Sequence, residues 1–243
     1  MSQPTAMTLL PPKTHRRHDR QNMPPTRPLV VLIHGLHMHA WVMRPLAKQL
    51  GRQGYHTRCF GYYSMVQDLA THSQRLQRWL SRYAQPQTPI YLVGHSLGGL
   101  VIRDFLSRYP QWQVPRCVTI GTPHNGSISA HTIVRYVPSF VGQAYFQGLD
   151  GHAPLLPQGV ALGSIAGSRS VGLGKLILPS KRQLAPLEPT WQVNDGTVFV
   201  HETKLIGAAD HLVLPASHTG LLWYPPVAQQ VDYFLRQGKF LHS

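Results

Sequence analysis

The sequence predicts an α/β fold, a mostly parallel sheet with helices on both faces. Short apolar runs, such as residues 29–33 and 90–93, are typical of strands that are buried on both faces of a sheet. Segments with apolar residues at helical spacing lie between these runs. Strands that alternate with helices along a chain favour parallel pairing, because each helix returns the chain to the edge where the strands begin.

The first half of the chain alternates in this way. Residues 29–33 predict a strand, 40–53 a helix that Gly54 ends, and 56–62 a second strand. An amphipathic helix follows and ends before Pro86, because mostly apolar residues recur there at helical spacing. These residues are Val66, Leu69, Ser73, Leu76, Leu80 and Tyr83.

The second half continues the alternation. Further strands are predicted at 90–93, 117–120, 161–166 and 210–214. A helix is predicted at 97–109, closed by Pro110, and a final helix begins at Pro225 and stops at Gly238. The stretch 127–189 is irregular apart from its one predicted strand.

Two parts of the chain differ in composition from the rest. Residues 1–28 are rich in Pro, Thr, Gln and basic residues and lack the apolar core of a signal peptide, so we expect a disordered basic tail. Residues 29–243 then form one globular domain, long enough to bury a full core. Within about 127–160, apolar residues exceed what a solvated loop would hold, which predicts a small cap or insertion, or an extra packing layer.

Composition and charge narrow the classes of partner. The chain has 243 residues, of which 42% are hydrophobic and 13% charged, as in globular proteins. Its net charge of +14 favours anionic partners such as membrane surfaces, nucleic acids or acidic substrates. No basic cluster interleaved with aromatics lies beyond the tail, so no nucleic-acid partner is predicted. No apolar run approaches the roughly 18 residues of a membrane helix. Because residues 1–28 also lack the apolar core of a signal peptide, we expect a cytoplasmic protein, and a peripheral contact with an anionic membrane stays open.

The most informative motif is Gly-His-Ser-Leu-Gly at residues 94–98. It lies between a predicted buried strand and a predicted amphipathic helix. A strained strand-to-helix turn of this kind exposes a serine, and it requires small residues two positions before and after, where a Cβ would collide with neighbouring backbone. Gly94 and Gly98 meet this requirement. Ser96 is therefore the predicted nucleophile.

A serine hydroxyl needs a base, and the base needs an orienting acid. Asp195 lies in an Asn-Asp-Gly turn followed by apolar residues, which predicts the acid, although turn chemistry alone also favours Asp there. His218, on the loop between the last predicted strand and the final helix, is the predicted base. Its competitors are His211, at the opposite end of that strand, and His201, on a peripheral segment.

Attack of a serine on an acyl group also needs backbone N–H groups that stabilise the oxyanion of the tetrahedral intermediate. The residue after the nucleophile, Leu97, supplies one predicted donor. The second is expected on the loop after an early strand, where Leu36 follows Gly35. Gly35 allows the backbone to turn so that this N–H faces the site.

No cofactor, metal or disulfide is predicted. His34, His37 and His39 lie close together in the sequence, but carboxylate or thiolate ligands at metal-binding spacing are missing nearby. The chain has two cysteines, Cys59 and Cys117. If the sheet is wound as in α/β-hydrolases, which the motifs of this chain resemble, two other strands separate the strands of Cys59 and Cys117. Their Cα atoms should then lie about 14 Å apart, too far for a disulfide. Both are expected to be free thiols.

Five sequence blocks resemble the α/β-hydrolase superfamily, in particular bacterial triacylglycerol lipases and GPI inositol-deacylase-like esterases. They lie at 32–36, 93–99, 120–127, 194–198 and 217–218. The block Gly-Thr-Pro-His-Asn-Gly-Ser at 121–127 is the most discriminating, since it is typical of lipase-like members. The resemblance covers about 29–241. It implies carboxylic ester hydrolysis through an acyl-enzyme, with Ser96 as nucleophile, His218 as base and Asp195 as its orienter.

The resulting hypothesis is a serine esterase or lipase acting on a small-molecule or lipid ester, with the apolar stretch 128–149 binding the acyl chain. An acyltransferase or thioesterase with the same triad is the alternative, and a catalytically silent binding scaffold is a third. The chain differs from secreted lipases in lacking a signal peptide and in its shorter cap region, which favours an intracellular esterase.

Overall fold

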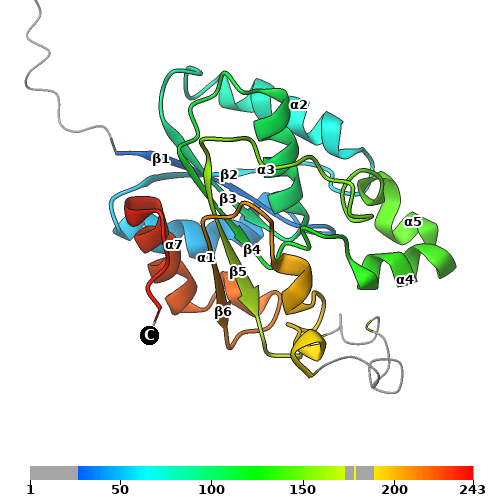
Figure 1. Cartoon of the computed structure of the whole chain (residues 1–243). Helices are drawn as coiled ribbons and strands as arrows, with labels where there is room; N and C mark the ends of the chain where they lie inside the picture. Colours follow the sequence, from blue (N-terminus) through cyan, green and yellow to red (C-terminus); the bar gives the residue numbers. More distant parts are fainter. Residues whose placement is uncertain (1–26, 173–177, 179–188, 243) are drawn as a thin grey trace, which may run out of the picture.

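The computed structural model describes residues 27–172, 178 and 189–242, and it contains a six-stranded parallel sheet (Figure 1). The strands are β1 (Leu29–Ile33), β2 (His56–Phe60), β3 (Ile90–His95), β4 (Arg116–Ile120), β5 (Ala161–Gly167) and β6 (Asp210–Leu214). Their order across the sheet is β2-β1-β3-β4-β5-β6, and every pair is parallel. The predicted α/β class is confirmed, and most of the predicted tail lies outside the described residues.

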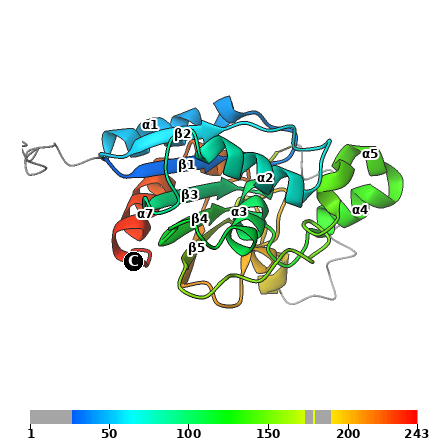
Figure 2. The same ribbon diagram turned by 90° about the horizontal axis from the view of Figure 1, so that it is seen from above.

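Helices cover both faces of this sheet (Figure 2). The helices are α1 (Arg44–Arg52), α2 (Leu69–Leu80), α3 (Leu97–Arg108), α4 (Ile128–Tyr136), α5 (Pro138–Val141) and α7 (Pro225–Gln237). Short 3-10 helices are η2 (Ala40–Met43), η3 (Gly142–Tyr145), η5 (Pro189–Gln192), η6 (Val200–Thr203) and η7 (Gly220–Leu222). Among the described residues, no helix combines the length and hydropathy needed to cross a bilayer.

The six predicted strands are all present, and the helices differ from expectation mainly at their ends. The helix expected at 40–53 is divided into η2 and α1, with Pro45 in the first turn of α1, where the N–H that proline lacks has no intrahelical partner. The final helix stops as predicted, because Gly238 adopts φ +77° and caps it. The irregular stretch after β4 contains α4, α5 and η3, which the sequence did not resolve.

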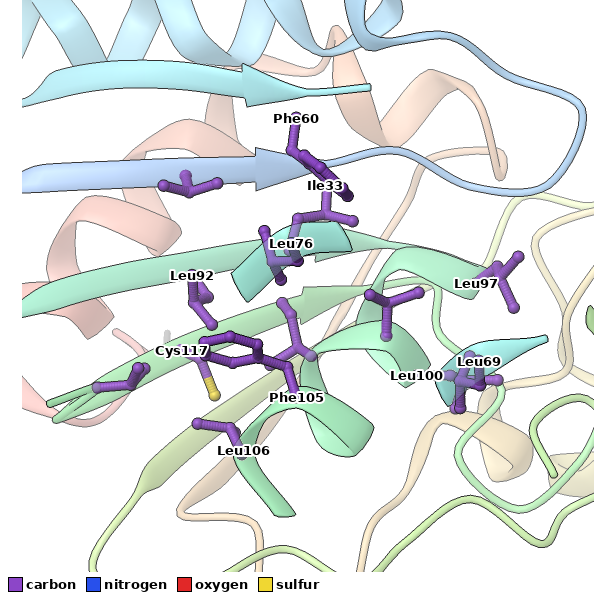
Figure 3. Close-up of a cluster of buried hydrophobic side chains, with 14 of the residues drawn as sticks. Ile33, Phe60, Leu69, Leu76, Leu92, Leu97, Leu100, Phe105, Leu106 and Cys117 are labelled. Carbon is purple, nitrogen blue, oxygen red and sulfur yellow. The ribbon is translucent and has the colours of Figure 1, made fainter. Parts of the chain in front are cut away.

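Two hydrophobic layers explain why the strands read as continuous apolar runs. All five residues of β1 are buried, and they alternate between the two faces. One face packs against α2 and α3, through the cluster that Figure 3 shows around Phe105 and Leu92. The other face packs against α1 and α7, through a cluster that includes Leu32 and Phe234.

Parallel pairing places the carboxyl ends of all six strands at one edge of the sheet. The segments after β1, β3, β4, β5 and β6 therefore meet there, and α4 and α5 lie beyond this edge (Figure 2). The cysteines Cys59 and Cys117 lie on β2 and β4, separated by β1 and β3, and both are free as predicted. The carboxyl edge is thus where the candidate site must lie.

Helix α7 packs so closely on β5 that we expect Gly163→Ala to destabilise the protein. A Cβ on Gly163 would lie 2.7 Å from ring carbons of both Phe234 and Phe240. Overpacking of this kind costs about 1–3 kcal/mol, so the melting temperature should fall in calorimetry. Gly51→Ala is the matched control, because its Cβ would meet only Thr57 Oγ1 at 3.9 Å. Equal melting temperatures for the two variants would contradict this packing.

Candidate active site

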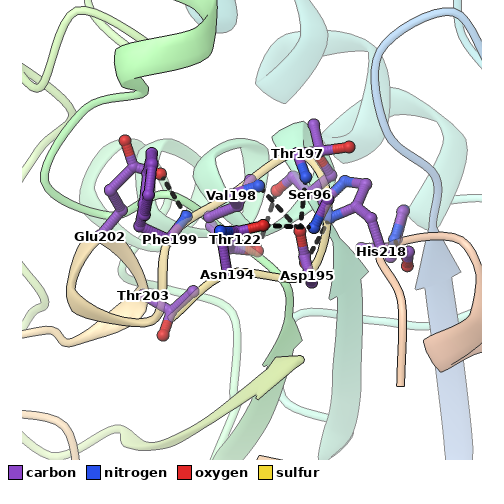
Figure 4. A network of polar contacts seen from close by, with 12 residues as sticks. Ser96, Thr122, Asn194, Asp195, Thr197, Val198, Phe199, Glu202, Thr203 and His218 are labelled. Atoms are coloured by element: carbon purple, nitrogen blue, oxygen red, sulfur yellow. Dashed lines mark hydrogen bonds and ion pairs between the residues drawn. The ribbon is translucent and has the colours of Figure 1, made fainter. Parts of the chain in front are cut away.

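Ser96 occupies a strained turn between β3 and α3. Its backbone angles are φ 53° and ψ −123°, a region that side-chain-bearing residues rarely adopt. Two contacts from the end of β4 brace the turn. The Ser96 N–H donates to the Ile120 carbonyl at 2.8 Å. Thr122 Oγ1, which Figure 4 shows beside Ser96, donates to the Ser96 carbonyl at 2.9 Å. The strain is therefore held by hydrogen bonds to the neighbouring strand.

The glycines around Ser96 are required by close backbone approach. A Cβ on Gly94 would lie 2.6 Å from the carbonyl carbon of Gly98. A Cβ on Gly98 would overlap the carbonyl oxygen of Ile33 at the end of β1. The small residues of the motif thus allow α3 to start directly against β1 and β3, which exposes the serine at the carboxyl edge.

Asp195 and His218 come together although they follow different strands. His218 Nδ1 lies 2.7 Å from Asp195 Oδ2, and Asp195 is fully buried (Figure 4). Its other oxygen, Oδ1, accepts the N–H groups of Thr197 and Val198 at 2.9 and 2.7 Å. One oxygen of Asp195 therefore accepts hydrogen bonds within its own turn, and the other contacts the imidazole of His218. A carboxylate accepts, so Nδ1 carries the proton and Nε2 has the free lone pair.

Ser96 and His218 line the same small cavity of about 140 Å³. Most of its other walls are apolar: Leu36, Met38, Pro123, Ala130, Ile133, Val141, Leu149 and Val198. Several of these belong to α4, α5 and the segment that follows them. Ser96 and His218 therefore border a mostly apolar cavity.

The loop after β1 approaches Ser96 closely. A Cβ on Gly35 would lie 2.9 Å from the Ser96 Cβ, and Leu36 lines the same cavity as Ser96. His34 Nε2 accepts the Tyr62 N–H at 3.3 Å, which leaves Nδ1 to donate to the Gly35 carbonyl at 2.9 Å. Burial lowers the pKa of His34 and keeps it neutral for this contact. The loop that carries the predicted donor Leu36 is therefore held in place.

The competing histidines lie elsewhere. His211 is at the amino end of β6, and its Nε2 lies 2.8 Å from Thr203 Oγ1. His201 belongs to η6 and packs against the rings of Trp191 and Phe199. Neither residue lines the cavity that Ser96 and His218 share.

Glu202 is a residue of this edge to which the sequence assigned no role. Its Oε1 accepts the N–H of Ile128 at 2.6 Å and its Oε2 the N–H of Phe199 at 2.8 Å. It therefore ties the start of α4 to the Asp195 turn. Burial raises the pKa of Glu202 to about 7, although both hydrogen bonds favour the charged form. Only its three-residue spacing from Phe199, typical of a capped first turn, could have been noticed in the sequence.

Arg103, on α3, is a second residue that sequence reasoning missed. It is buried and donates to three carbonyls, those of His124, Ala153 and Pro154, at 2.8 to 2.9 Å. Burial lowers the pKa of Arg103 to about 10. The guanidinium thus fastens the segment that follows β4 and the segment that precedes β5 to α3.

A parallel α/β sheet with a serine on the strained turn after a central strand defines the class of proteins built around a nucleophile elbow. The chain belongs to the alpha/beta hydrolase family, whose model matches residues 30–235.

Solved structures share this fold at low sequence identity. The mature lipase BlEst2 of Bacillus licheniformis superposes with a TM-score of 0.66 and 18% identity, over 90% of this chain and 94% of that one. The metagenomic carboxyl esterase MGS0156 gives 0.61 and 18%, over 86% and 75%. Polyneuridine aldehyde esterase gives 0.57 and 15%, over 87% and 100%. No curated protein sequence matches the chain.

Glu202 should give this protein a characteristic pH dependence of stability. Because its pKa of about 7 in the folded state exceeds the ordinary value of 4.5, the folded state binds its proton more tightly than the unfolded state. Its contribution to the free energy of unfolding therefore falls as pH rises through this window. Gln does not titrate, so the free energy of the wild type minus that of Glu202→Gln should decrease from pH 5 to pH 7 and then level off.

Urea unfolding at several pH values measures this difference. Asp68→Asn is the control, because the hydrogen bonds to Thr71 lower the pKa of Asp68 and it stays ionised throughout this range. Its difference from the wild type should be constant. A constant difference for Glu202→Gln as well would contradict a raised pKa.

Proposed function

We propose that the protein is a serine carboxylic ester hydrolase with Ser96 as nucleophile, His218 as base and Asp195 as the orienting acid. One observation carries the proposal. The 2.7 Å contact between His218 Nδ1 and Asp195 Oδ2 leaves Nε2 as the free base, and His218 lines the same apolar cavity as Ser96. A buried acid, an imidazole in one tautomer and a serine on a strained turn are what nucleophilic acyl transfer requires.

In the proposed reaction, Ser96 Oγ attacks the ester carbonyl while its proton passes to His218 Nε2. The carbonyl oxygen becomes negatively charged and accepts hydrogen bonds from the N–H groups of Leu36 and Leu97. The intermediate collapses to an acyl-enzyme, and the departing alcohol takes the proton from His218. Asp195 stays ionised and stabilises the imidazolium. Water then repeats the sequence and releases the acid.

The cavity favours an ester with an apolar acyl group. Ala130, Ile133 and Val141 of the 127–160 segment form part of its wall, so we propose that this segment acts as the cap that binds the acyl chain. Three of the structures that share the fold are named as a lipase, a carboxyl esterase and polyneuridine aldehyde esterase, and ester chemistry is common to them. This supports ester hydrolysis here.

Replacing the nucleophile tests the proposal. Ser96→Ala should lower kcat on p-nitrophenyl esters by several orders of magnitude, because no oxygen remains to form the acyl-enzyme. The wild type should be tested on esters of increasing acyl length, with product analysis to separate hydrolysis from transfer to an added alcohol. Thioester substrates belong in the same panel.

Two further variants serve as comparisons in this test. Asp195→Asn should also reduce kcat strongly, since the amide no longer holds the working tautomer of His218. His211→Gln should leave kcat close to the wild-type value, because His211 lies at the amino end of β6. Full activity of Ser96→Ala would exclude the proposed nucleophile.

We further propose that the carboxyl edge of the sheet contacts an anionic lipid surface. Exposed large apolar side chains follow the ends of several strands there: Trp41, Tyr63, Val66, Tyr136, Val137, Phe146 and Trp223. Exposed Arg44 and Arg135 belong to the same segments as Trp41 and Tyr136, and exposed Arg169 follows β5, on a chain whose net charge is +14. Exposed apolar side chains together with arginines complement an anionic bilayer.

Vesicle sedimentation tests the lipid contact. Binding to vesicles of equal parts phosphatidylcholine and phosphatidylserine should exceed binding to pure phosphatidylcholine and should weaken with salt. The double variant Tyr63→Ser, Tyr136→Ser should bind several-fold more weakly. Ile206→Ser is the matched control, because Ile206 is 95% exposed but lies on the segment that leads into the amino end of β6. Equal binding to both vesicle types would refute this contact.

A further inference from the structure

His95, the residue before Ser96, takes no part in the proposed reaction, yet it contacts the proposed base, His218. It is the last residue of β3 and is fully buried. Its ring packs against that of His218, with centroids 4.7 Å apart and an interplanar angle of 49°. A buried imidazole that contacts the proposed base needs an explanation that packing alone does not supply.

The hydrogen bond of His95 defines its tautomer. Nε2 lies 3.0 Å from the backbone carbonyl oxygen of His218, and a carbonyl can only accept, so Nε2 carries the proton. Burial and the neighbouring His218 together lower the pKa of His95 to about 3, so the ring is neutral at ordinary pH. Nδ1 has no hydrogen-bond partner among the described residues. The side chain therefore makes one polar contact there, and that contact goes to His218.

This contact completes the anchoring of His218. The His218 N–H donates to the Asp195 carbonyl at 2.9 Å, and Nδ1 donates to Asp195 Oδ2 at 2.7 Å. Both of these anchors come from the turn after β5. The His95 bond is different, because it comes from β3, the strand that leads directly into Ser96. It thus joins the proposed base to the element that positions the nucleophile.

The other side of the ring faces the loop after β1. A Cβ on Gly35 would lie 3.2 Å from His95 Nδ1, so the ring fills the space beneath this loop. His95 is therefore wedged between the loop that carries Leu36 and the loop that carries His218. A displacement of its ring would therefore shift both loops.

We propose that His95 is a positioning residue whose Nε2–H bond to the His218 carbonyl holds the base imidazole at the distance that proton transfer from Ser96 requires. The inference rests on the proposed function, since it acts through His218. Proton transfer and attack depend steeply on geometry, and a misplacement of about 1 Å can cost roughly a hundred-fold in rate.

Two variants of similar length separate this role from simple space filling. In His95→Gln the amide nitrogen stands as many bonds from Cα as Nε2 does, so the donor is kept. In His95→Met a methyl group stands there, so volume is kept and the donor is lost. If His95 only fills space, the two variants should behave alike.

The full chain should be assayed on p-nitrophenyl acetate for kcat and KM, and by the rate at which a fluorophosphonate labels Ser96. We expect His95→Met to lower kcat and labelling about ten- to a hundred-fold, with KM nearly unchanged. His95→Gln should retain most of both rates. The downfield proton resonance of the His218–Asp195 hydrogen bond should persist in His95→Gln and broaden in His95→Met.

Equal activities of His95→Gln and His95→Met, whether both high or both low, would overturn the proposal. If His95→Met does not fold, His95→Asn replaces it, because its amide is one bond too short to reach the carbonyl and should give the same loss. Wild-type rates in His95→Asn would then overturn the proposal. Ser96→Ala runs alongside, and activity in that variant would refute the hydrolase function itself, whatever the His95 variants do.

Discussion

The close approach of α3 to the end of β1 is the constraint on which the rest of the site depends. Gly98 packs against the Ile33 carbonyl, and only a residue without a Cβ fits there. Next to this contact the chain passes through the strained backbone of Ser96, and the loop at Gly35 lies so close to the serine that a Cβ there would meet the Ser96 Cβ at 2.9 Å. The same geometry explains why hydrogen bonds from the end of β4 are needed, since a strained turn persists only where its surroundings hold it.

A second layer of contacts joins segments that are remote in the sequence. Asp195 stabilises its own turn with one oxygen and His218 with the other, so the acid and its supporting loop are one unit. Glu202 connects that unit to the start of α4. Arg103 connects α3 to the segment that precedes β5. The apolar cavity is therefore bounded by elements that buried polar groups hold together, which makes its shape depend on their hydrogen bonds.

The sequence was most informative where local pattern and burial agree. The strand at 210–214 has the bounds that were predicted, and β1 and β3 were recognised because both of their faces are apolar. It was least informative after β4. There α4 has only Ser129 and Ala130 buried, and it is held by Glu202, a residue far along the chain. Hydrophobic periodicity cannot predict a helix that is stabilised by a carboxylate far away in the sequence.

The sequence by itself determined the six strands and the helices α1, α2, α3 and α7 in chain order, the turn that carries Ser96, and the candidates for an acid and a base. Local spacing is enough for these features, because they depend on residues close together in the chain. Only the tertiary structure decided that Asp195 reaches His218, that His211 faces another edge, and that His95 bonds to the base loop. Parallel pairing collects the ends of distant strands at one edge, and the hydrogen bonds made there depend on side-chain directions that no local pattern encodes.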